Sequence, residues 1–150
     1  MYRFVSFVLL SSIISILLYF HNENGHQMTS GHHENHQLEA IELPKGHKVP
    51  SIKGSVKQNA SGSWLLHLET ENFTFTPEKA DSNELQYNQG HAHLYVNGEK
   101  IKRLYRHSYQ LGNLKEGPNQ IKVTLNTTTH GVLTFHNKEI AYYETVEVIK

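Results

Sequence analysis

The chain has 150 residues, including 14 basic and 14 acidic side chains, 12 histidines and no cysteine. A formal net charge of zero gives no basic field for binding nucleic acid. The lack of cysteine excludes a disulfide framework, a cysteine-based zinc site and the thiolate of a blue-copper centre.

The first twenty residues have the layout of an export signal. Arg3 precedes an uncharged apolar run at residues 4–20, as the basic region precedes the apolar region in a signal peptide. The run is at the lower length limit for crossing a hydrocarbon core of roughly 30 Å. We therefore expect residues 1–20 to form an apolar helix that is either a cleaved signal peptide or a membrane anchor. Because the positive charge precedes the run, we expect the rest of the chain outside the cytoplasm, in the periplasm or cell envelope.

Residues 21–50 are polar and rich in histidine, asparagine, glutamine and glutamate. Such a composition buries too little apolar surface to offset the entropy lost on ordering, so we expect a disordered linker. Its imidazoles and its thioether are candidate ligands for Cu(II), Zn(II) or Cu(I). These candidate ligands are His26, Met28, His32, His33 and His36. The pattern predicts weak metal capture by the linker, with a plain polar spacer as the alternative interpretation.

Residues 51–150 consist of short β-prone runs separated by turns, which predicts one all-β domain. We expect about seven to nine strands in an antiparallel β-sandwich of immunoglobulin-like or cupredoxin-like type. The run at residues 63–70 places its large apolar residues on one face: Trp64, Leu66 and Leu68. Residues 72–77 alternate phenylalanine with threonine, and Pro77 ends that expected strand.

The strongest hairpin signal follows the run at residues 91–96. Asn97-Gly98 lies between two β-prone runs, and both residues tolerate the positive φ angles of a tight turn. The return strand is expected at residues 100–106. Later strands are expected at residues 120–126, 132–136 and 140–149, the last two as a hairpin.

His91 and His93 form the main candidate metal site of the domain. On a strand, residues i and i+2 point to the same side with Cα atoms about 6.5–7 Å apart, so both imidazoles can bind one ion. The opposite face of this strand carries Ala92, Leu94 and Val96. Because the apolar face is expected to turn toward the core, we expect the two histidines to be accessible to solvent.

A third ligand is expected from another part of the domain. The candidates are His130, His67 and His107, and the choice depends on a strand order that the sequence does not show. The alternative interpretation of His91 and His93 is structural, with hydrogen bonds from both rings to the backbone or to Tyr95.

Two stretches resemble known bacterial proteins. The segment Gly90–Gly98 (GHAHLYVNG), together with Arg103–Tyr105, Val123–Asn126 and His130, is similar to a family of small exported bacterial β-sandwich proteins of largely uncharacterised function. This resemblance covers residues 64–150 and implies a β-sandwich in the cell envelope. The short stretch FTFTPE, which begins at Phe73, resembles an early strand of cupredoxin-like exported domains. It does not imply cupredoxin electron transfer, because no cysteine is present for a type 1 copper site.

The leading hypothesis is a non-enzymatic envelope protein that binds a transition metal for storage, delivery or tolerance. Copper is the favoured metal and zinc is the alternative. The expected partners are the metal ion and another envelope protein, with membrane contact through residues 4–20 if that run is not cleaved. The sequence has no nucleophile-elbow, zinc-protease or phosphate-loop motif, which argues against an enzyme. Two alternatives remain open: an exported interaction module with structural histidines, and a metal-dependent enzyme with His91, His93 and His130 as ligands.

Overall fold

The computed structural model of the chain describes residues 39–79 and 83–149. Within these ranges the chain forms eleven β-strands and one 3₁₀ helix, η1 (Pro77–Lys79). This part of the chain is therefore all-β, as the alternating runs predict. Because Pro77 begins η1, the strand expected at residues 72–77 is reduced to β4 (Thr74–Phe75). The expected helix at residues 1–20 lies outside the described residues.

The described strands form two sheets. The larger sheet contains β1 (Ala40–Glu42), β4, β5 (Gln89–Val96), β6 (Glu99–Leu104), β8 (Gly117–Thr127), β9 (Val132–Phe135), β10 (Lys138–Glu139) and β11 (Ala141–Val148). The smaller sheet has the order β2 (Ser51–Gln58), β3 (Trp64–Glu71) and β7 (Ser108–Gly112). In the larger sheet β8 is central, because it pairs with β5 along one side and with β11 and β9 along the other.

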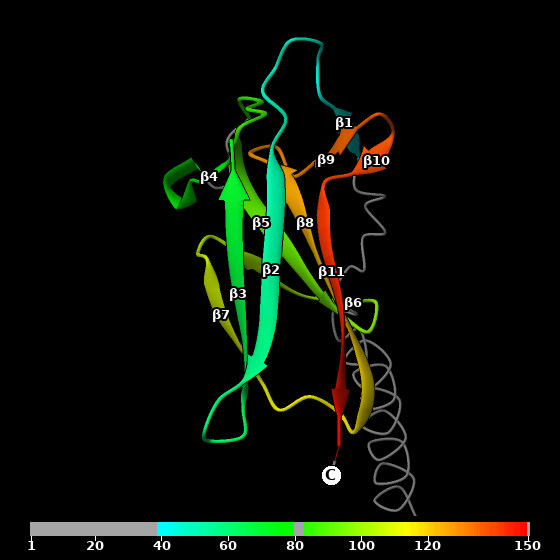
Figure 1. Cartoon of the computed structure of the whole chain (residues 1–150). Coiled ribbons are helices and arrows are strands. Elements are labelled where there is room, and N and C mark those ends of the chain that lie inside the picture. The colour runs from blue at the N-terminus through cyan, green and yellow to red at the C-terminus, as the bar shows by residue number, and fades with distance from the viewer. Residues whose placement is uncertain (1–38, 80–82, 150) are drawn as a thin grey trace, which may run out of the picture. The chain divides into compact units, whose positions relative to one another are not determined.

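One hydrophobic core contains side chains from both sheets. Figure 1 shows β2 and β3 in front of β5 and β8, and the buried apolar residues of these strands belong to one cluster. Its most deeply buried members, all at most 1% exposed, include Leu66 and Leu68 of β3, Leu94 of β5, and Val123 and Leu125 of β8. Full burial of a side chain of this size contributes about 1.5–3 kcal/mol. The period-2 alternation in the sequence therefore supplies the apolar faces that hold the sheets together.

The turn between β5 and β6 is the predicted hairpin turn. The φ angles of Asn97 and Gly98 are 53° and 84°, and a two-residue turn with positive φ at both positions matches the twist of the flanking strands. β6 pairs antiparallel with β5, which confirms the expected return strand. The register shifts between Leu94 and Tyr95, because β6 has one extra residue, Ile101, between the partners Lys100 and Lys102.

The last predicted hairpin differs in the structure. β9 pairs with the short β10 through a turn in which His136 and Asn137 have φ angles of 53° and 58°. β11 leaves this hairpin and pairs with β8 instead. The Glu144 carboxylate of β11 accepts hydrogen bonds from the backbone N–H of Val56 in β2, at 2.9 Å, and from the Tyr142 hydroxyl. The bond from Val56 links β11 to the smaller sheet, while β8 pairs with β11 in the larger sheet.

The folded unit begins before the predicted linker boundary at residue 50. β1 pairs in parallel with β9, and Leu43 lies in the core with 6% of its surface exposed. The Glu42 carboxylate accepts hydrogen bonds from the Thr134 hydroxyl at 2.7 Å and from the backbone N–H of His136 at 2.6 Å. The β1–β9 and β4–β5 pairs are parallel, whereas the other strand pairs of the described residues are antiparallel, as predicted.

Gly90 lets β5 approach β8 closely just before the candidate ligands. Its φ angle is 154°, and a Cβ at this position would lie 2.1 Å from the carbonyl oxygen of Asn126. Since a real Cβ cannot come so close to a backbone atom, any side chain here must displace one of the two strands.

We predict that Gly90→Ala lowers the free energy of unfolding by about 2–5 kcal/mol, because backbone strain and steric overlap act together. Gly98→Ala is the matched control, since Gly98 also has a positive φ but a Cβ there meets nothing within 4 Å. The control should lose only the strain of about 1–2 kcal/mol. Urea unfolding of both variants gives the comparison, and equal losses would contradict the close approach of the two strands.

Candidate metal centre

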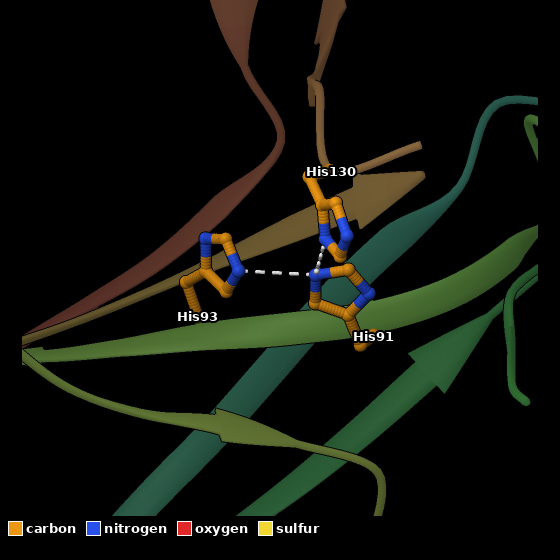
Figure 2. A group of neighbouring side chains, drawn as sticks. All are labelled: His91, His93 and His130. Atoms are coloured by element: carbon orange, nitrogen blue, oxygen red, sulfur yellow. Dashed lines mark hydrogen bonds between the residues drawn. The ribbon is translucent and has the colours of Figure 1, made fainter. Parts of the chain in front are cut away.

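Three histidines from two parts of the larger sheet come together. His91 and His93 are neighbours on one face of β5, and His130 lies in the turn that joins β8 to β9. The turn is tight, because the backbone N–H of His130 donates to the Thr127 carbonyl at 3.1 Å, and the φ angle of His130 is 74°. The Asn126 side chain donates to the His130 carbonyl at 3.1 Å. Figure 2 shows the three rings pointing toward one another.

The distances between the imidazole nitrogens are close to those of a metal site. His91 Nε2 lies 3.0 Å from His93 Nε2 and 3.5 Å from His130 Nδ1. The three candidate ligand atoms all lie within 4.8 Å of one another. Metal–imidazole bonds of about 2.0–2.1 Å place two ligand nitrogens roughly 3.3–3.6 Å apart in tetrahedral or trigonal geometry. Small ring rotations would therefore bring all three nitrogens onto one ion.

The pair on β5 is buried, so the predicted solvent access of His91 and His93 is wrong. Their exposed fractions are 1% and 0%. They do lie opposite the apolar residues of β5, as predicted, but this second face of the sheet is buried at their positions as well. Their partners on β8, Asn126 and Thr124, are also buried and hydrogen-bonded to each other at 2.8 Å. Only His130 of the three is partly exposed.

Burial and positive neighbours keep His93 neutral. The pKa of His93 is lowered from 6.5 to about 2, first by burial and then by the charges of Lys100, His91, Arg103 and His130. A neutral ring retains one lone pair for a metal ion. When Nε2 binds the ion, Nδ1 carries the proton, and within the described residues this Nδ1 has no hydrogen-bond partner.

Two tyrosines flank the pair on β5. The ring centre of Tyr105 lies 5.6 Å from that of His91, and the ring centre of Tyr95 lies 6.4 Å from that of His93. The Tyr105 hydroxyl accepts a hydrogen bond from Arg103 at 3.3 Å. His91 contacts both His93 and His130 directly, so these imidazole contacts and aromatic packing would be part of a purely structural role.

The other candidate ligands lie elsewhere. His67 is on β3 of the smaller sheet, where its ring is hydrogen-bonded to Ser108 at 3.1 Å. His107 lies 3.4 Å from the Thr70 hydroxyl and packs on Phe75. The structure thus brings His130, and neither of these two, to the β5 pair. The linker candidates lie outside the described residues: His26, Met28, His32, His33 and His36.

Sequence reasoning missed the part that β6 plays at this site. Arg103 is paired with His93 across the strands, and Lys100 with Tyr95. Their sequence pattern favours an edge strand kept soluble by charge. Counting across the Asn97-Gly98 turn places Lys100 opposite Tyr95, on the histidine face of the sheet. The same count places Arg103 opposite Ala92, and only the register shift between Leu94 and Tyr95 brings Arg103 opposite His93.

No family model matches the chain, and comparisons with curated proteins and with solved structures also give no match. The resemblance to small exported β-sandwich proteins therefore stays a prediction. Among the residues that the structure describes, no helix has the length and apolar character needed to cross a membrane. The apolar run at residues 4–20 lies outside that search.

The lowered pKa of His93 predicts how the stability of the metal-free protein changes with pH. Below pH 6.5 the unfolded chain binds a proton at this histidine and the folded chain does not, so stability falls as the pH falls. Between pH 7 and pH 5 this one group should cost about 2 kcal/mol. Chemical unfolding of the wild type and of His93→Gln at both pH values measures the effect. An equal loss in the two proteins would contradict a buried, neutral His93, and His67→Gln serves as the exposed control.

Proposed function

We propose that this chain is a non-enzymatic protein of the cell envelope that binds copper for storage, delivery or tolerance. The observation that carries the proposal is the convergence of three imidazole nitrogens within 4.8 Å, with two of the rings buried. Neutral imidazoles are good ligands for copper and zinc, whereas hard cations such as Mg²⁺ and Ca²⁺ prefer oxygen. Copper is our first choice and zinc the alternative.

The hydrogen bonds among the rings support a metal-binding role. A ring nitrogen of neutral imidazole either donates one hydrogen bond or accepts one. His91 Nε2 is approached by both His93 Nε2 and His130 Nδ1, at 3.0 Å and 3.5 Å. His91 Nε2 can form a good hydrogen bond with only one of these two nitrogens at a time. One metal ion would engage all three lone pairs at once.

The envelope location rests on sequence. Arg3 and the apolar run at residues 4–20 are typical of a signal peptide or an N-terminal anchor. We further propose that the domain is an immunoglobulin-like or cupredoxin-like β-sandwich related to small exported bacterial proteins. Support comes from the two sheets with a shared core and from the GHAHLYVNG segment. The proposal contains no catalytic step, because the sequence lacks the common catalytic motifs.

A second function is favoured by one observation. A 3.0 Å contact between two fully buried histidines is also what a structural polar pair would show. In that case the chain would be an exported interaction module that binds no metal in its folded domain. The two functions differ in whether metal binding depends on the β5 pair.

We predict that the full-length chain, kept soluble with a mild detergent, binds one equivalent of Cu(II) or Zn(II) in a site that needs the β5 pair. The double variant His91→Ala/His93→Ala should lose that equivalent, with affinity reduced at least about 100-fold, because two of three ligands are gone. Calorimetric titration measures both stoichiometry and affinity.

His67→Ala is the matched control, because His67 is an imidazole on the other sheet. It should leave the one-equivalent site unchanged. Weak binding of several equivalents that is the same in all three proteins would place metal capture in the linker, and the folded domain would then be the interaction module.

A further inference from the structure

Two cations lie on the strand next to His93, one of the two buried histidines of the group. Arg103 is directly opposite His93 in the β5–β6 ladder, and Lys100 is opposite Tyr95, the next residue on the same face. Directly paired residues on one face of a sheet have Cβ atoms about 4.5–5.5 Å apart. Lys100 and Arg103 therefore belong to the same face of the sheet as His91 and His93.

The two cations also influence each other and the ring of His93. Both lower the pKa of His93, and the pKa of Lys100 is itself lowered by burial and by Arg103. The other face of β6 is different. Lys102 is opposite the core residue Leu94, and its ammonium lies 5.7 Å from the ring centre of Tyr109.

The three ligands bring no negative charge to the group. His91, His93 and His130 are neutral donors, and no carboxylate of the described residues joins them within ligand distance. The three imidazoles therefore neutralise none of the charge of a bound ion. Since a charge in a buried setting is stabilised little by solvent, it is more sensitive to nearby cations than a charge in water would be, although solvent screens part of the repulsion from the exposed Lys100.

This repulsion depends on the charge of the ion. It is twice as large for a divalent ion as for a monovalent ion at the same place. We infer that the centre takes its copper as Cu(I), and that Lys100 and Arg103 set this preference over divalent ions. The inference rests on the proposed metal-binding function and specifies the oxidation state of its ligand. Neither cation binds the metal; each acts through its charge.

The test compares three neutralising variants in one background. In this background of the full-length chain, the predicted linker ligands are replaced by alanine to remove the metal capture expected there: His26, Met28, His32, His33 and His36. Arg103→Gln and Lys100→Gln each remove a cation from the histidine face. Lys102→Gln is the matched control, because it removes the same charge from the other face of the same strand. Lys100 is exposed, so its replacement should leave folding intact even if Arg103→Gln does not.

Two dissociation constants are measured for each protein. The Cu(I) constant comes from anaerobic competition with a chromophoric Cu(I) chelator, and the Cu(II) constant from competition with glycine. We expect the preference for Cu(I) over Cu(II) to fall about tenfold in Arg103→Gln and in Lys100→Gln. A tenfold change equals a drop of about 59 mV in the potential of the bound copper. Lys102→Gln should change the preference by less than about threefold.

Each other result has a defined meaning. If all three variants shift the preference equally, or none does, the inference about Lys100 and Arg103 is wrong, while the metal centre stands. If neither copper ion binds the wild type more tightly than it binds His91→Ala/His93→Ala in the same background, the metal centre itself is wrong. The inference then fails with it.

Discussion

The pairing of β5 with β8 is the contact on which both the core and the histidine group depend. The ladder runs from Gly90 opposite Thr127 to Val96 opposite Ile121. One face of this ladder carries the apolar residues that pack in the core, and the other carries His91 and His93. A slip of one residue would exchange the two faces and place imidazoles in the core. Because Gly90 has no Cβ, the two strands can lie close together beside the site. A Cβ there would overlap the Asn126 carbonyl.

The same ladder positions the third ligand. β8 ends at Thr127, and its tight turn brings His130 back over the partner of His91, Asn126. The Asn126 side chain stabilises the turn by donating a hydrogen bond to the His130 carbonyl at 3.1 Å. The main-chain geometry of the turn thus places His130 beside His91 and His93, and it does so without a metal ion. Such a preformed group pays little ordering entropy when an ion binds.

Several features of the fold and the site were predictable because their causes are local. Alternation of large apolar residues predicts the buried face of β3, and the Asn97-Gly98 turn predicts the β5–β6 hairpin. The spacing of His91 and His93 predicts that they share a face, because strand side chains alternate.

The remaining features depend on distant partners. The Glu42 carboxylate accepts a hydrogen bond from Thr134, which lies 92 residues further along the chain. The composition of residues 21–50 therefore does not reveal that β1 belongs to the fold. The burial of His91 and His93 depends on which elements surround the second face of the sheet, and the choice of His130 over His67 depends on strand order. Alternation within one strand carries neither kind of information. The position of Lys100 was available from the hairpin turn, but that of Arg103 depends on the register shift between Leu94 and Tyr95, which the sequence does not reveal.

The central claim is that one metal ion joins the three imidazoles. Crystals of the full-length chain grown with copper, measured at the copper absorption edge, would test it most directly. The account predicts an anomalous peak about 2.0–2.1 Å from Nε2 of His91, Nε2 of His93 and Nδ1 of His130. A fully occupied copper peak bound only by other residues, with the 3.0 Å contact between His91 and His93 unchanged, would contradict it.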